Sequence, residues 1–239
     1  RDTVAPRYEE KVGSFFKDPW QARNTYIDVI LDRSPESLNS FFTAHAYQAL
    51  GEEEKTTALK LLELQRQTLL MYTSCGWFFD ELSRIETVQV LQYAGRAVQL
   101  AQEVFGNNIE GQFLERLEQA KSNLKRHGDG RRIYEKFVKK AVVDLKDVCA
   151  HYALCSIFEQ YPEQASVYCY TIDQRAYRDS EAGRAKLALG RAQITSRITR
   201  ESADLSYGVL HWGDQNMNCG VGEYQGEETY QTIAQGASE

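Results

Sequence analysis

The period of the hydrophobic pattern changes near Tyr161-Pro162, and no other feature of the sequence constrains the fold as much. Before this point apolar residues recur at steps of three and four, as on a helix that buries one face. After it they recur near every second residue, as in strands. The sequence therefore predicts an α+β protein. We expect a mainly α-helical bundle over residues 1–162 and a smaller antiparallel β-rich region over residues 163–239, which either leans on the bundle or is incomplete at Glu239.

Two helix starts are clearly marked in the first part of the chain. Asp18-Pro19 and Ser34-Pro35 each combine a side chain that accepts hydrogen bonds from free amides with a proline, which lacks only an amide that would be unbonded in the first turn. These signals predict helices over residues 19–32 and from residue 35 to near Gly51. Further helical patterns cover residues 52–72, 86–105 and 109–124.

The last helical pattern is the most regular one. Its apolar residues follow steps of three and four over residues 134–155, as in the seam of a helical bundle. We therefore expect one long bundle helix that ends before Tyr161-Pro162. Beyond it the glycine-rich stretch 208–226 is expected to be mostly loop, and strands are predicted over residues 167–172, 184–198 and 204–212.

The charge balance excludes one large class of functions. The chain has 239 residues and a net charge of −6, whereas a nucleic-acid-binding surface needs a concentrated basic face. The basic run over residues 121–132 lies between helical patterns and is interpreted as a solvated connection. We therefore expect no nucleic acid as a partner.

Cysteine use and hydropathy indicate the compartment. The five cysteines show neither a disulfide framework nor the paired C-x-x-C spacing of a zinc site, so we expect reduced thiols, no metal and no cofactor. No run of about 18 apolar residues could span a bilayer, and no signal segment opens the chain. These features predict a cytoplasmic protein without a membrane partner. The first residue is Arg1, which is compatible with a segment cut from a longer protein.

One stretch combines residue types that neither a plain core nor a plain surface loop would contain. Small residues at Cys75-Gly76 precede the aromatic run Trp77-Phe78-Phe79, which is followed by Asp80 and Glu81. Flat apolar rings beside carboxylates suit a sugar, because the rings meet its C–H face and the carboxylates accept its hydroxyls. The alternative is structural: the three rings fill the end of a bundle, and the two acids cap the next helix.

A second cluster lies near the end of the predicted strands. His211, Trp212 and Asp214 bring together an aromatic ring and polar groups that can bond hydroxyls. The alternative interpretation is an edge strand that ends in a turn.

The sequence lacks the common catalytic motifs. It contains no G-x-S-x-G, no P-loop, no H-E-x-x-H and no G-x-G-x-x-G after a strand. Asp80 and Glu81 make a poor acid and nucleophile pair for glycoside hydrolysis, because sequence neighbours rarely face each other across a bond. A Cys–His pair around His151 competes with the simpler interpretation that Cys149 and Cys155 are apolar seam residues. We therefore expect no catalytic residue in this chain.

The stretch Leu69–Glu81, followed by Ile85–Ala94, resembles the domain of unknown function that follows the catalytic domain in a bacterial subgroup of glycoside hydrolase family 57, the alpha-amylase-related group. The resemblance extends more loosely over residues 8–212. It implies a parent protein with an N-terminal seven-stranded (β/α) barrel that carries the catalytic carboxylates. Neither an alternating strand-helix run nor a His-x-His pair of that barrel occurs here.

The resemblance also implies a role for the aromatic stretch. In that family the bundle contributes a loop to the rim of the active-site cleft, so a substrate-lining role is carried over to matching residues of this chain, namely Cys75, Trp77, Phe78, Asp80 and Glu81. The expected function is then a non-catalytic C-terminal region of an alpha-glucan-acting hydrolase or glucanotransferase, inactive alone, whose partners are the catalytic barrel of the same parent chain and an alpha-glucan or oligosaccharide. The alternative is a structural module that docks on the barrel or on another subunit without contacting sugar.

Overall fold

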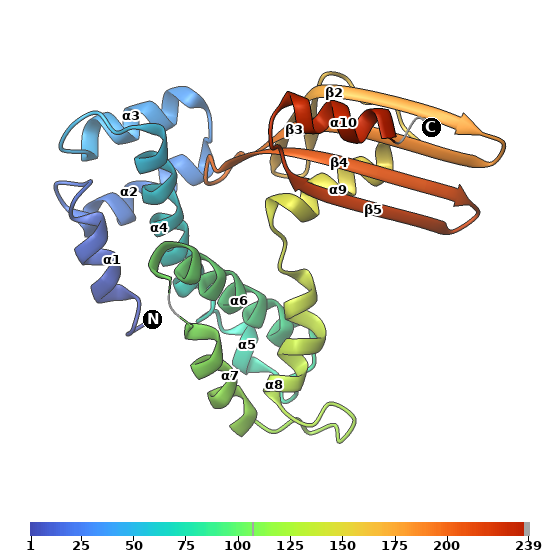
Figure 1. Ribbon diagram of the computed structural model, residues 1–239. Helices are drawn as coiled ribbons and strands as arrows, with labels where there is room; N and C mark the ends of the chain where they lie inside the picture. The colour runs from blue at the N-terminus through green and yellow to red at the C-terminus, as the bar shows by residue number, and fades with distance from the viewer. Residues whose placement is uncertain (107, 237–239) are drawn as a thin grey trace. The chain divides into compact units, whose positions relative to one another are not determined.

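The computed structural model describes residues 1–106 and 108–236 (Figure 1). The chain divides into two compact units, Arg1–Val142 and Val143–Glu239. The first unit is helical, and the second contains an antiparallel sheet, so the predicted α+β class is confirmed. The division between the units falls earlier than the boundary expected near residue 162.

The first unit is built from helices whose starts follow the sequence signals. The Asp18 carboxylate accepts hydrogen bonds from the amides of Trp20 and Gln21, both at 2.9 Å, and the Ser34 hydroxyl accepts one from the Ser37 amide at 3.2 Å. The elements are α1 (Ala5–Val12), α2 (Pro19–Leu31), α3 (Pro35–His45), α4 (Glu52–Leu70), α5 (Cys75–Phe78), α6 (Ile85–Phe105), α7 (Ile109–Gln119) and α8 (Gly130–Ile133), followed by a π-helical turn (Tyr134–Val138) and a 3-10 turn (Lys139–Ala141).

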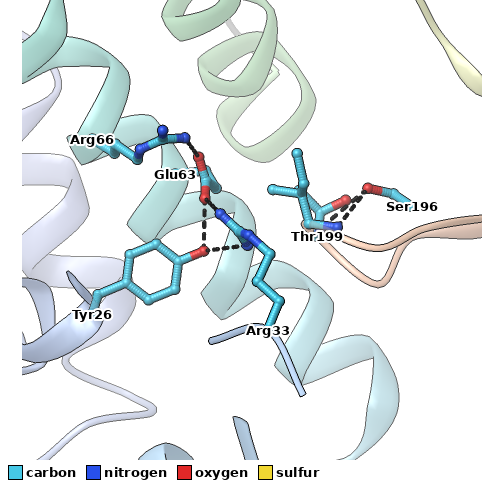
Figure 2. Close-up of polar contacts among 7 residues, drawn as sticks. Tyr26, Arg33, Glu63, Arg66, Ser196 and Thr199 are labelled. Carbon is cyan, nitrogen blue, oxygen red and sulfur yellow. Dashed lines mark hydrogen bonds and ion pairs between the residues drawn. The ribbon is translucent and has the colours of Figure 1, made fainter. Parts of the chain in front are cut away.

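Helix α4 runs through the middle of this unit and carries a buried carboxylate. Glu63 is only 2% exposed, and it accepts hydrogen bonds from the Tyr26 hydroxyl at 2.8 Å, the Arg33 guanidinium at 2.8 Å and the Arg66 guanidinium at 3.1 Å (Figure 2). Because both guanidinium groups pair with one carboxylate, its charge is compensated inside the protein. The network ties Tyr26 of α2, and Arg33 shortly after this helix, to α4.

The second unit is a meander of five antiparallel strands in the order β1-β2-β3-β4-β5. A chain turn between β3 and β4 is closed by Ser196, whose hydroxyl accepts hydrogen bonds from the amides of Ile198 and Thr199, each at 3.2 Å (Figure 2). The elements are α9 (Leu145–Ser156), β1 (Gln164–Val167), β2 (Tyr170–Ala182), β3 (Ala185–Ser196), β4 (Ser202–Gly213), β5 (Asn216–Glu223) and α10 (Glu227–Gly236).

The two helices of this unit cover opposite faces of the sheet (Figure 1). Helix α9 packs Tyr152 against Ile194, Tyr207 and Val209 to form a core. Gly208 lies between Tyr207 and Val209 on β4 and therefore faces the other side, where it lines a cavity together with residues of α10.

The long helix predicted over residues 134–155 is wrong. The chain leaves the helix after Ala141, and α9 restarts at Asp144, whose carboxylate accepts the Asp147 amide at 2.9 Å while the Asp147 carboxylate accepts the Asp144 amide at 3.0 Å. This capping box starts a new helix. Because periodicity shows only that a helix buries one face, it did not reveal that α9 packs on the sheet rather than in the bundle.

The strand prediction was right for β3 and β4 and partly right before them. The stretch expected as one strand over residues 167–172 is divided by a hairpin turn: β1 ends at Val167, Tyr168 lies in the left-handed region at φ 52°, and β2 begins at Tyr170. The stretch 208–226 is not mostly loop, because β4 continues to Gly213 and β5 occupies residues 216–223. Helix α7 ends at Gln119, earlier than expected, and α10 was not predicted.

Candidate functional site

The aromatic segment, residues 75–81, lies in the first unit between α4 and α6. Its first residues form the single helical turn α5, which sits directly against α6. A side chain at Gly76 would approach the Val90 methyl groups to 2.9 Å, so glycine permits this close contact. The Thr87 hydroxyl of α6 also lies 3.4 Å from the backbone oxygens of both Gly76 and Glu81. Helix α6 is therefore the support on which the segment rests.

The rings of this segment are at the surface. Trp77 and Phe78 are each 74% exposed, and Phe79 is 37% exposed. Phe78 and Phe79 meet edge to face with ring centroids 5.1 Å apart, and the Arg84 guanidinium lies 5.1 Å from the centroid of Phe79. The interpretation that these rings fill the end of a bundle does not fit this geometry. The segment instead presents an open aromatic surface.

Glu81 anchors the segment at its end. The side chain is 9% exposed, and its carboxylate accepts hydrogen bonds from the Ser122 hydroxyl at 2.7 Å, the Ser83 amide at 2.9 Å and the Asn123 amide at 2.8 Å. Partial burial favours the neutral acid, but these hydrogen bonds outweigh it and lower the pKa of Glu81 to about 2. Because its oxygens are engaged in this way, Glu81 holds the segment in place and is not a free acceptor for a ligand.

The other acid of the segment behaves differently. Asp80 is exposed, and its backbone oxygen accepts a hydrogen bond from the Asn123 side-chain amide. Neither acid caps α6, which begins after Arg84. The structure thus brings together Cys75, Trp77, Phe78 and Asp80 as exposed groups, with Glu81 beneath them.

Sequence reasoning missed the residues that fix this anchor. Ser122 and Asn123 come from the basic run, which was interpreted only as a solvated connection, and they contact a segment about forty positions earlier. No local pattern marks such a long-range pairing. The only sequence feature that distinguishes Ser122 and Asn123 is that they are small and polar within a run of charged residues.

The second predicted cluster does not converge on one site. His211 is 8% exposed on the α9 face of β4, where its ring meets Phe158 edge to face at 5.3 Å and its Nε2 lies 3.1 Å from the Asp214 backbone oxygen. Trp212 follows it on the strand and therefore points to the opposite face, where it is 59% exposed. Asp214 sits in the β4–β5 turn at φ 53°. The strand ends in a turn as the alternative predicted, although β5 pairs with it, so it is not an edge strand.

The cysteine and histidine side chains of α9 are close but not tightly paired. The Cys155 thiol lies 4.0 Å from the His151 imidazole Nε2, while Cys149 is fully buried in the core of the second unit. Burial raises the pKa of the Cys149 thiol to about 12, so this group is an apolar core residue and not a nucleophile.

Two kinds of feature were not found in the described part of the chain. Among residues 1–106 and 108–236, no three or more His, Cys, Asp or Glu side chains are grouped so that they could hold a metal ion. Within the same described part of the chain, no helix has both the length and the apolar character needed to cross a bilayer.

The comparison with known proteins gives a family. A model for a domain of unknown function, DUF3536, matches residues 1–239, and the chain therefore belongs to this family. No curated protein matches the chain. No solved structure matches it either.

Proposed function

We propose that this chain is a non-catalytic region of an alpha-amylase-related glycoside hydrolase or glucanotransferase, in which the aromatic segment forms one wall of a carbohydrate-binding cleft. The observation that carries the proposal is the exposure of Trp77 and Phe78, each 74% open to solvent on a segment that is held from beneath. The link to a catalytic barrel rests on the resemblance of residues 69–94 to the region that follows the barrel in glycoside hydrolase family 57.

The chemistry of the segment supports a sugar ligand. Aromatic faces carry partial negative charge and attract the partially positive C–H groups on the flat side of a pyranose. Asp80 supplies an exposed carboxylate next to these rings, which can accept sugar hydroxyls. With few contacts available, the segment alone should bind an oligosaccharide weakly, with a Kd on the order of millimolar.

A second function is favoured by one specific observation. Ile85, at the start of α6, is 79% exposed close to the aromatic segment in sequence, and an aliphatic side chain is better suited to protein packing than to sugar binding. A groove of about 510 Å³ between α2 and α4 also reaches Thr73 and is lined mainly by apolar side chains, with Arg23 and Arg66 among the rest. These features suit a module that docks on a barrel or subunit.

The experiment is a substitution of Trp77 in the full-length parent protein. Trp77→Ala should lower kcat/KM on alpha-glucan by about tenfold, because one stacking contact is worth about 1.4 kcal/mol. Tyr47→Ala is the matched control, since Tyr47 is 62% exposed on the same unit and lies outside the segment. Equal activity of the Trp77→Ala and Tyr47→Ala proteins on alpha-glucans would contradict the cleft role. If Ile85→Ala instead disrupts the packing of this region on the catalytic barrel of the parent protein, the result supports the docking function.

A further inference from the structure

The groove between helices α2 and α4 has a volume of about 510 Å³, and every residue that lines it belongs to the first unit. Tyr26 and Leu62 lie at its base and are almost fully buried. Its sides include Ile27 of α2, which is 50% exposed, and Leu69 of α4, which is 53% exposed. Because its apolar sides are half open to solvent, the groove is a surface channel and not an enclosed pocket.

The apolar surface continues past the groove along α2. Leu31 follows Ile27 by four positions, so the two side chains lie on the same face of the helix, and Leu31 is 79% exposed. Contiguous exposed apolar side chains often mark a site of protein interaction. A small molecule, by contrast, usually has most of its surface buried in its pocket. The open groove and its extension therefore favour a polypeptide as the occupant.

The helices that border the groove determine the conformation that such a polypeptide can adopt. The amide and carbonyl groups of α2 and α4 bond within their own helices. An extended peptide would find no backbone partner between them, and leaving buried backbone groups unpaired is costly. A helix satisfies its own backbone and can insert apolar side chains at steps of three and four residues. The lining of α2 extends from Arg23 to Ile30, which is about 10 Å of helix axis, or two turns.

Two arginines give the groove a positive charge. Arg23 and Arg66 line it, and no aspartate or glutamate does so among the described residues. Arg23 donates hydrogen bonds to the Asn24 side chain and lies 5.1 Å from the centroid of the Trp20 ring, and no carboxylate of the described chain pairs with it. Arg66 uses Nη1 for Glu63 at 3.1 Å, which leaves its other N–H groups for a partner (Figure 2). The complementary partner therefore carries carboxylates.

We propose that the groove between α2 and α4 binds an acidic amphipathic helix of a partner protein. The apolar face of that helix packs on Ile27 and Leu69, and its carboxylates pair with Arg23 and Arg66. The inference deepens the docking function, the second one proposed above, and rests on it, because it gives the chemistry of the partner. It does not depend on the sugar-binding role of the aromatic segment.

The test is a fluorescence-anisotropy titration of the whole chain into a labelled synthetic peptide. The peptide has about four helical turns, leucine at every third or fourth position and glutamate on both sides of the leucine stripe. A second peptide has lysine in place of each glutamate. The acidic peptide should bind with a Kd on the order of 10 μM, and the lysine peptide at least tenfold more weakly. Arg23→Glu should reverse this preference.

The variants separate charge from apolar packing. Lys140→Glu is the matched control for Arg23→Glu, because Lys140 is exposed on the 3-10 turn of the same unit and does not line the groove. Ile27→Ser should weaken the acidic peptide by about tenfold, since the bound helix would cover a side chain that is 50% exposed. Melting curves check that each variant is folded, and Ile27→Ser decides the matter if Arg23→Glu is not.

Three results would overturn the proposal: no binding of the acidic peptide, equal affinity of the wild-type chain for both peptides, or unchanged affinity in both Arg23→Glu and Ile27→Ser. Binding of sodium laurate in place of the peptide would also overturn it, because the groove would then take a small amphipathic anion. So would a dimer of the chain, seen by sedimentation, that Arg23→Glu dissociates, because a second copy would then fill the groove.

The same variants separate this proposal from the functions proposed above. Trp77→Ala should leave the affinity for the acidic peptide unchanged, and Arg23→Glu should leave the binding of maltoheptaose unchanged. Loss of peptide binding in Trp77→Ala would contradict the groove as the site. If the peptide does not bind but Ile85→Ala disrupts the packing on the catalytic barrel, the docking function stands and the acidic helix is wrong.

Discussion

At the scale of single residues, two buried carboxylates determine how the first unit is held together. Glu63 of α4 binds Tyr26 of α2 and Arg33, which follows α2, and Arg66 of α4 pairs with the same carboxylate. Glu81 joins the aromatic segment to residues 122–123. Both acids are fully hydrogen-bonded, which is what burial of a charged group requires. In both cases the pKa is lowered although burial opposes it, because hydrogen bonds to the charged form outweigh desolvation.

Glu81→Gln should destabilise the first unit by about 1–2 kcal/mol at neutral pH, because the amide cannot replace a carboxylate that accepts hydrogen bonds from three residues. The pKa of Glu81 falls from a usual value of 4.5 to about 2 on folding. A lowered pKa stabilises the fold above pH 4.5, and this contribution is lost as the pH falls toward 2. Urea unfolding of both proteins between pH 7 and pH 2 measures the difference.

The control for this prediction is Asp80→Asn. The Asp80 side chain is exposed, so its substitution should change stability by less than about 0.5 kcal/mol at any pH. A stability difference between wild type and Glu81→Gln that stays constant down to pH 2 would show that Glu81 is not held as an anion.

At the scale of elements, the glycines of the sheet show what local patterns do and do not reveal. The alternation along β3 and β4 identified both strands, because one face of each is buried against α9. Glycines in the stretch 208–226 suggested loop, since glycine is rare in strands. The role of a glycine in the sheet depends on what lies opposite its Cα atom: the Tyr207 ring lies there for Gly190 of β3, whereas no described atom lies within 4 Å of a Cβ placed at Gly220 of β5. Such partners are set by tertiary structure.

Gly190→Ala should destabilise the second unit by about 2–3 kcal/mol, because the methyl group would overlap the Tyr207 ring in a closely packed core. Thermal unfolding followed by circular dichroism measures the effect. In a Tyr207→Leu background the same substitution should cost clearly less, since the contact at 2.2 Å involves the outer atoms of the tyrosine ring. Equal costs in both backgrounds would mean that the ring does not require glycine at this position.

At the scale of the whole molecule, the sequence predicted the class of the fold and the helices α2, α3, α4, α6 and α7. Capping residues such as Asp18 and Ser34 are local signals, and the structure confirms them. The limits of the two units were not predictable in this way, because α9 has the same period whether it packs on helices or on a sheet. The candidate segment was recognised from its composition, but its anchor at Ser122 and Asn123 joins distant parts of the chain, which no local pattern shows.

The proposal for the whole molecule is that an exposed aromatic segment contacts sugar while Glu81 and helix α6 hold it in place. This requires Trp77 itself to report on binding. Trp20 and Trp212 also fluoresce, so their replacement by phenylalanine leaves Trp77 as the single tryptophan.

Titration of this single-tryptophan chain with maltoheptaose is the most direct measurement. We expect a saturable change in Trp77 fluorescence with a Kd on the order of millimolar. The emission maximum of Trp77 should also shift to shorter wavelength, because a bound pyranose would shield a ring that is 74% exposed in the free chain. A spectrum that stays unchanged up to saturating oligosaccharide would contradict the carbohydrate role of the aromatic segment.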